Sequence, residues 1–152
     1  MSFERSDHVW PIRITRPILW GQMDALGHLN NTAFFVYFEE SRIELFDRLS
    51  MRATKAASHI GPILASTDAQ FLAAVVHPDT LTCETRVRSI GNTSFVLDHR
   101  IHSLVQGATV AVGKSAVVLY DYQNHRKVPL DVDLRRGLQR MIGGDEGDTR
   151  VD

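Results

Sequence analysis

The stretch WGQMDALGHLNNTAFFVYFEESRIEL, residues 20 to 45, decides the fold of this chain of 152 residues. Its first part combines two glycines, an aspartate and paired asparagines, a composition typical of a structured turn. From Thr32 to Leu49, apolar residues recur at steps of three and four, which predicts a helix with a wide apolar face. Asn30 or Asn31 is the expected N-cap of this helix. Such a helix is usually enclosed, so we expect a sheet to wrap around it.

Segments on both sides of this helix have strand patterns. Ile12 to Trp20 mixes β-branched and basic residues, and Pro17 favours an edge strand or a bulge. Residues 51 to 61 follow no regular pattern, whereas residues 63 to 76 form a loose strand pattern. Turn signals at Gly91-Asn92 and Gln106-Gly107 separate three further strands, which predicts an antiparallel meander over residues 81–89, 94–104 and 109–122.

The end of the chain has a short helical pattern, because apolar residues recur at helical spacing between residues 134 and 142. We therefore predict a single domain over residues 1–142, followed by a disordered tail at residues 143–152. The element order predicts an α+β fold, in which one long helix packs on an antiparallel sheet.

Composition and charge exclude several classes of function. The formal net charge is -1 and the Lys and Arg residues are scattered, so the chain has no basic patch for nucleic acid. No stretch reaches the roughly 18 apolar residues of a membrane span, and the N-terminus lacks the apolar core of a signal peptide. The single cysteine, Cys83, has no partner for a disulfide, which suits a reducing cytoplasm.

Asp24 is the first candidate for chemistry, because it precedes the predicted helix by a few residues. A carboxylate beside a helix N-terminus offers a base or nucleophile together with N–H donors for an oxyanion. Taken alone, an aspartate beside glycine and asparagine is more often a turn or capping residue. His28 lies in the same turn and is either a second catalytic group or a residue that holds the loop in place.

Residues 20 to 45 resemble the signature of the 4-hydroxybenzoyl-CoA thioesterase family, a branch of the hotdog superfamily. In that signature an aspartate and a Gly-His-x-Asn-Asn motif run into an aromatic helix with Glu and Arg on its middle turns. Gln22 stands where the family has a first acidic residue. The positions that match are Asp24, Gly27, His28, Asn30, Asn31, Tyr37, Glu39 and Arg42.

The resemblance implies a hotdog fold, in which an antiparallel sheet wraps around one long central helix, and an acyl-CoA thioesterase activity without a cofactor. It implies a homo-oligomer, either dimer or tetramer, with active sites at the subunit interface. Asp24 would be the general base or the nucleophile, with His28 as a second catalytic residue. The residues expected to bind substrate are Gly27, Asn30, Asn31, Phe34 and Tyr37.

Three alternatives stay open at this point. One branch of hotdog thioesterases carries its carboxylate on the central helix, which makes Glu39 or Glu40 a rival to Asp24, although Glu39 and Arg42 are more simply an ion pair one turn apart. A hotdog hydratase or dehydratase would pair Asp with His, and a non-catalytic acyl-CoA binding module would need neither. No histidine spacing indicates a zinc site, and no Gly-x-Ser-x-Gly elbow indicates a serine nucleophile.

Overall fold

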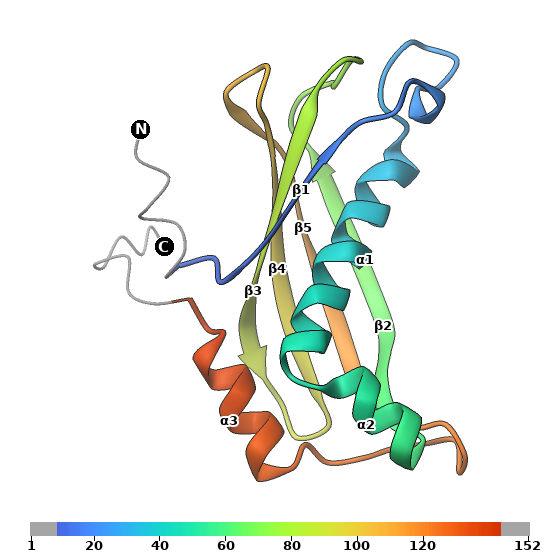
Figure 1. The fold of residues 1–152 in the computed structure, drawn as a ribbon, viewed down its shortest axis with the longest axis vertical. Coiled ribbons are helices and arrows are strands. Elements are labelled where there is room, and N and C mark those ends of the chain that lie inside the picture. Colours follow the sequence, from blue (N-terminus) through green and yellow to red (C-terminus); the bar gives the residue numbers. More distant parts are fainter. Residues whose placement is uncertain (1–8, 144–152) are drawn as a thin grey trace.

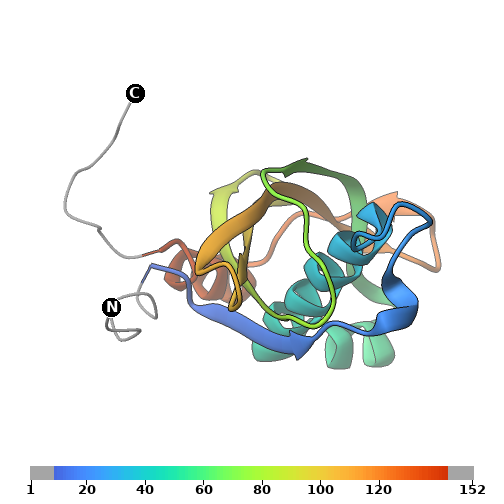
Figure 2. The same ribbon diagram turned by 90° about the horizontal axis from the view of Figure 1, so that it is seen from above.

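A curled antiparallel sheet encloses one long helix in the computed structural model, which describes residues 9–143 (Figures 1 and 2). The six strands of the described chain run in the order β1-β3-β4-β5-β2, with the short β6 paired to β5. This is the expected hotdog arrangement, and it confirms the α+β prediction. The strands are β1 (Ile12–Pro17), β2 (Ile60–Phe71), β3 (Thr80–Ile90), β4 (Ser94–Ser103), β5 (Ala108–Asp121) and β6 (Arg126–Lys127).

The central helix α1 (Asn31–Arg48) lies within one residue of its predicted bounds. Asn30 is its N-cap, and the Asn30 side chain accepts a hydrogen bond from the backbone N–H of Thr32. Its inward face is buried against the sheet, as its apolar pattern predicts. The buried residues are Ala33, Phe34, Tyr37, Phe38, Ser41, Arg42, Leu45 and Phe46.

The core consists of two apolar clusters along α1. Phe38 is fully buried in the cluster near the N-terminal half of the helix, and Leu45 is fully buried in the cluster near the C-terminal half. Each such side chain contributes about 1.5–3 kcal/mol through its burial. The short helix α3 (Val132–Arg140) adds Leu138 to the second cluster, which confirms the helical pattern read from the end of the chain.

The meander of β3, β4 and β5 is confirmed, with Cys83 opposite Ile101 in the register. Pro17 ends β1, which is an edge strand as expected. At the other edge lies β2, a 12-residue strand that pairs with β5 on one side only among the described residues. The two edge strands of the sheet therefore differ: β1 is short, whereas β2 presents a long free edge.

Three expectations about local structure were wrong. Residues 51 to 61, expected to be irregular, contain the helix α2 (Met51–Ser58), which is set off from α1 by Ser50 in the left-handed region with φ 57. Only Met51 of α2 is buried, so its sequence lacks the apolar stripe that reveals a helix. The first and second strands also end earlier than expected, because Trp20–Gln22 forms a 3₁₀ turn (η2) and the chain leaves β2 at Phe71. The predicted tail lies outside the described residues except for Gly143.

A buried chain of polar side chains crosses the sheet beneath α1. Ser41 Oγ lies 2.5 Å from Thr85 Oγ1, which lies 2.6 Å from His99 Nδ1. On the other side of the ring, His99 Nε2 lies 2.8 Å from Ser115 Oγ, which accepts a hydrogen bond of 3.1 Å from Arg42 Nη1. Arg42 thus points into the core, and the expected ion pair with Glu39 is replaced by this contact with Ser115.

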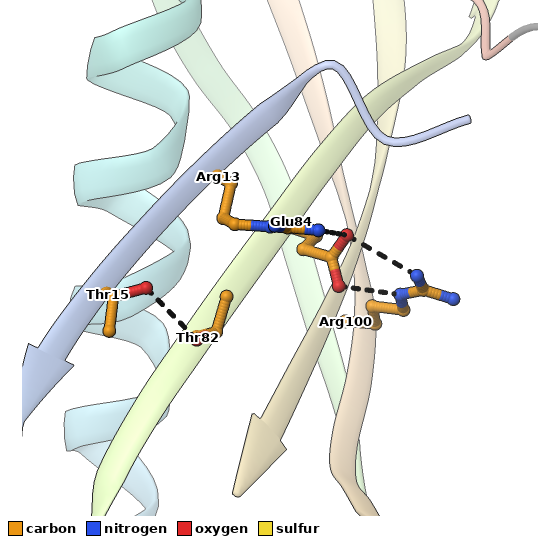
Figure 3. Close-up of polar contacts among 5 residues, drawn as sticks. All are labelled: Arg13, Thr15, Thr82, Glu84 and Arg100. Carbon is orange, nitrogen blue, oxygen red and sulfur yellow. Dashed lines mark hydrogen bonds and ion pairs between the residues drawn. The ribbon is translucent and has the colours of Figure 1, made fainter. Parts of the chain in front are cut away.

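The opposite face of the sheet is charged. Glu84 accepts hydrogen bonds from Arg13 at 3.4 Å and from Arg100 at 3.2 Å, so three neighbouring strands are linked by one carboxylate (Figure 3). Thr15 and Thr82 make a further contact of 3.0 Å between β1 and β3 (Figure 3). Side chains alternate between the faces of a strand, so these groups lie on the side of the sheet away from α1.

Candidate active site

The loop from Asp24 to His28 is a tight hairpin turn. The backbone N–H of Asp24 donates to the carbonyl of His28 at 2.7 Å, and that of Gly27 donates to the carbonyl of Asp24 at 3.1 Å. Gly27 has φ +82, a left-handed conformation that side chains disfavour. A turn with Asp at its first position and a left-handed Gly after it is a common short hairpin connection. The geometry of this turn therefore sets the position from which the Asp24 side chain extends.

Only one oxygen of the Asp24 carboxylate is used to hold this turn. Oδ1 accepts hydrogen bonds from the backbone N–H groups of Leu26 at 2.8 Å and His28 at 3.3 Å. This is the capping role that an aspartate in such a turn commonly has. Oδ2 has no hydrogen-bond partner among the described residues. The half-buried carboxylate is therefore oriented by one oxygen and leaves the other available.

The N-terminus of α1 supplies hydrogen-bond donors beside this loop. The Asn30 side chain accepts from the N–H of Thr32 at 3.0 Å, and the Asn30 carbonyl accepts from Ala33 at 3.0 Å. The N–H of Asn31, the first residue of the helix, donates to no acceptor within residues 9–143. A helix N-terminus carries partial positive charge, so a free N–H there favours an anionic ligand atom.

Asp24 and the start of α1 line a hollow of about 500 Å³, which we call the helix hollow. Phe34 and Phe71 meet edge to face in its wall, with ring centroids 5.1 Å apart. The backbone N–H of Leu29 donates to the carbonyl of Val75 at 2.8 Å, which joins the loop to the segment after β2. The lining residues are Asp24, Leu29, Asn30, Asn31, Phe34, Phe71, Leu72, Ala73, Ala74 and Val75.

A second hollow of about 370 Å³, the loop hollow, lies on another side of the same carboxylate. Asp24 is the one residue of the described chain that lines both of these hollows. The rim of the loop hollow includes Trp20, whose side chain is 77% exposed. The lining residues are Trp20, Gly21, Met23, Asp24, Ala25, Gly27, Val76 and His77.

The structure brings most, but not all, of the predicted site residues together. Asn30, Asn31 and Phe34 line the helix hollow with Asp24, whereas Gly27 lines the loop hollow. His28 is exposed and lines neither hollow.

Three further residues of the motif helix also lie away from the two hollows. Tyr37 is only 4% exposed and belongs to the core, where burial and then Glu40 raise its pKa to about 12. Glu40 pairs with Arg16 at 3.3 Å, and neither Glu39 nor Glu40 lines a hollow with Asp24. The geometry therefore favours Asp24 over the two helix carboxylates.

Sequence reasoning missed one wall of each hollow. Phe71 is the last residue of β2, and Leu72 to Val75 follow it. In the loop hollow, Val76 and His77 come from the next part of the same segment. These segments meet Asp24 only because the sheet returns the chain to the same end of α1. A further hollow of about 310 Å³ lies at the opposite end of α1, beside Leu49, Met51 and Leu134. None of the predicted site residues lines it.

The comparisons with known proteins identify the class of protein to which this fold belongs. The chain belongs to the Thioesterase-like superfamily, whose family model matches residues 18–138. The described residues contain no helix long and apolar enough to cross a membrane.

Relatives and solved structures extend this result. The chain is 22% identical over 120 residues to the long-chain acyl-CoA thioesterase FadM of Escherichia coli. The matched region covers 79% of this chain and 91% of FadM. The PA2801 protein of Pseudomonas aeruginosa is 33% identical, with a TM-score of 0.75 over 84% of this chain and 97% of that one. A Thermus thermophilus thioesterase complexed with coenzyme A and Zn has the same fold, with 23% identity, a TM-score of 0.78 and coverage of 90% and 98%.

Proposed function

We propose that this chain hydrolyses acyl-CoA thioesters to a free acid and coenzyme A, with Asp24 as its catalytic carboxylate. The chain is a thioester hydrolase by its family. One observation carries the finer proposal: the free oxygen of Asp24 and the free N–H of Asn31 both belong to residues that line the helix hollow. A thioester carbonyl in this hollow would have a carboxylate and an oxyanion donor beside it.

Asp24 would act in one of two ways. As a general base, it takes a proton from water while the water oxygen attacks the carbonyl carbon, and the C–S bond then breaks. As a nucleophile, its oxygen forms a mixed anhydride with release of the thiolate, and water then opens the anhydride. In both routes negative charge develops on the carbonyl oxygen, where the Asn31 N–H and the helix N-terminus stabilise it.

We further propose that two copies pair through β2 to complete the site. Among the described residues the free edge of β2 is long, and the last residue of this strand, Phe71, is 48% exposed and lines the helix hollow. Ile63 and Leu64, exposed by 37% and 43%, add one exposed apolar side chain to each face of the same strand. Antiparallel pairing of β2 with its copy would satisfy the free edge and cover these side chains, in a dimer or a tetramer built from dimers.

The assignment to the 4-hydroxybenzoyl-CoA branch, the cytoplasmic location and the role of His28 remain proposals. In a single chain His28 lies outside both hollows. It would reach the substrate only if the loop changed its conformation or if a second copy of the chain completed the site. The hydratase alternative needs an Asp and His pair around one substrate, and the geometry of Asp24 and His28 does not favour it. A non-catalytic binding module would bind the same acyl-CoA ligands but would not hydrolyse them.

The test is release of free thiol from a panel of acyl-CoA thioesters, from short aliphatic to aromatic, by wild type, Asp24→Asn and Asp133→Asn. The Asn side chain keeps an oxygen for the Leu26 and His28 N–H groups, so the turn should survive. We expect kcat/KM to fall by about two orders of magnitude or more in Asp24→Asn. Asp133, exposed on α3, serves as the matched control and should retain wild-type activity.

Two results would contradict this proposal. An active Asp24→Asn enzyme would limit Asp24 to its role in the turn, and Glu39 and Glu40 would become the candidates. A wild type that binds acyl-CoA tightly but releases no thiol from any thioester would indicate the binding module. A thermal unfolding midpoint for each variant separates loss of chemistry from loss of the fold.

A further inference from the structure

We propose that α1 carries a self-complementary interface, in which Arg42 of one copy binds the partner's Glu39 and Glu39 binds the partner's Arg42. The inference rests on the pairing through β2 proposed above and names the contact that would fix its geometry. Its starting point is the set of charges on α1. Arg42 and Glu39 are one turn apart, and neither forms an ion pair within residues 9–143.

Arg42 is a buried cation that no carboxylate of the described chain neutralises. The residue is 6% exposed, and its hydrogen bond goes from Nη1 to Ser115 Oγ, a neutral group. Thr85 and His99, which continue the buried polar chain, bring no negative charge either. Burial lowers the pKa of Arg42, and Glu39, which partly opposes this effect, lies beyond ion-pair distance. A charge buried without a counter-ion is costly, so we expect a carboxylate to complete this site.

Glu39 is the acidic side chain of α1 that no arginine of the described chain engages. It is exposed and lies on the flank of the helix that also carries Phe35 and Arg42, because positions 35, 39 and 42 form one stripe. Phe35 meets Phe71 of β2 edge to face, with ring centroids 6.4 Å apart, so this flank is turned toward β2. The other acidic residues of α1 each have an arginine: Glu40 has Arg16, Glu44 has Arg48 and Asp47 has Arg52.

The inner face of β2 is uncovered beside this flank of α1 (Figures 1 and 2). Three of its residues lie opposite buried residues of β5 in the register: Leu64 opposite Val117, Thr67 opposite Ser115 and Phe71 opposite Ala111. Unlike their partners on β5, the three residues of β2 are exposed, Leu64 by 43% and Phe71 by 48%. Pairing along the edge of β2 would bring the α1 helix of a second copy beside this face, because both helices lie on the same side of the joined sheet.

A two-fold axis would make the two unmatched charges partners of each other. Antiparallel pairing of β2 with its copy sets the two α1 helices antiparallel as well. In such a contact, residue i of one copy meets residue j of the other, and residue j meets residue i. Positions 39 and 42 lie on either side of a point close to the middle of α1 (Asn31–Arg48), so two antiparallel helices overlap along most of their length when these charges meet. One geometry therefore satisfies both charges, twice in each dimer.

The test uses two charge-reversal variants, Glu39→Lys and Arg42→Glu, alone and mixed. Each variant alone places like charges in both contacts of its dimer. In a mixed dimer, the new lysine faces the new glutamate and the native Arg42 faces the native Glu39, so both contacts are attractive again. We expect the dissociation constant from sedimentation to rise about a hundredfold in each variant and to return within about tenfold of wild type in the mixture. A pairing inside one chain cannot give this recovery.

A second pair of variants leaves the buried arginine in place. Glu39→Gln and Glu44→Gln each change one glutamate of α1 to its isosteric amide, and Glu44 has its partner, Arg48, within the same chain. We expect Glu39→Gln to raise the dissociation constant about tenfold and Glu44→Gln to match wild type. Far-ultraviolet circular dichroism shows which variants keep the fold. If Arg42→Glu fails to fold, this second pair decides alone.

The outcomes separate this inference from the proposed hydrolysis. If wild type hydrolyses acyl-CoA but Glu39→Lys and Glu39→Gln leave the dissociation constant unchanged, the ion pair is wrong while the hydrolase proposal stands. If charge reversal and mixing behave as expected but no thioester is hydrolysed, the interface stands and the proposed function fails. A mixture that associates no better than its folded single variants would overturn the inference. So would a wild type that stays monomeric at every concentration, and the occupant of this face would then be a different protein.

Discussion

The ring of Phe38 lies flat against the imidazole of His99, with centroids 4.6 Å apart and an angle of 13° between the planes. Both ring nitrogens of His99 face hydroxyl groups, Thr85 at Nδ1 and Ser115 at Nε2. Ser115 also accepts from Arg42, whose positive charge disfavours a second charge nearby. Burial, and then Arg42, lower the pKa of His99 to about 3. His99 is therefore neutral in the folded protein.

This neutral histidine should make stability depend on pH. Its folded pKa of about 3 lies below the unfolded value near 6.5, so between these values the unfolded chain binds a proton that the folded chain does not. The contribution is complete above about pH 6.5 and is lost as the pH falls toward 3. Between pH 6.5 and 4.5 the loss is at most about 3 kcal/mol, because each unit is worth about 1.4 kcal/mol.

The measurement is the free energy of unfolding in urea at several pH values for wild type, His99→Gln and His102→Gln. We expect His99→Gln to be less stable at pH 7 but to lose less stability on acidification. His102 lies on the same strand and faces the other side of the sheet, so its variant should follow the wild-type pH dependence. An unaltered pH dependence in His99→Gln would contradict the assignment.

Gly113 allows α1 and the sheet to pack closely at the ring of Phe38. A Cβ at this position would lie 2.6 Å from Cε2 of Phe38 and would also meet the backbone carbonyl oxygen of Asp68. We expect Gly113→Ala to lower the free energy of unfolding by about 2–3 kcal/mol, because neither the fully buried ring nor the backbone can move freely. Gly21→Ala, with no heavy atom within 4 Å of its Cβ, is the matched control. Equal free energies of unfolding for Gly113→Ala and Gly21→Ala would contradict the expected clash at Gly113.

Gly27 sets the backbone geometry of the loop that carries Asp24 rather than its packing. Its added Cβ would meet nothing within 4 Å, so the cost of Gly27→Ala comes from the left-handed φ of +82. We expect a loss of about 1 kcal/mol in stability and a larger relative loss in kcat/KM, since the turn holds Asp24. Gly27→Asn should recover part of both, because Asn tolerates this conformation better. Indistinguishable Ala and Asn variants would mean that the loop tolerates a changed turn.

The sequence predicted those parts of the fold and site that local patterns encode. The α1 helix follows from its 3.6-residue period, and Asp24, Asn30, Asn31 and Phe34 lie close together in the chain, so one motif locates them all. The other wall of the helix hollow, from Phe71 onward, comes from the end of β2 and is brought there only by the sheet.

Two other features could not be predicted from the sequence, for a different reason. The left-handed Ser50 that separates α1 from α2 is a backbone conformation, and a serine gives little indication of it. From the sequence, Arg42 is expected to pair with Glu39 one turn away, whereas its guanidinium donates a hydrogen bond to Ser115 inside the sheet. A pattern of apolar and polar letters cannot show a buried polar chain, because each member looks like a surface residue until its partners are known.

Cys83 should be unreactive in the folded protein. It is fully buried on β3, and burial raises the pKa of its thiol to about 12, so almost none of it is thiolate at pH 8. We expect a disulfide reagent such as dithionitrobenzoate to label no protein thiol in native buffer and one per chain in 6 M guanidinium. Leu104→Cys, at a position that is 68% exposed, should add one thiol that reacts at once. Rapid labelling of native Cys83 would show that β3 opens readily, and slow labelling that rises with denaturant would report unfolding. The same experiment ensures that thiol released in the hydrolysis assay comes from coenzyme A.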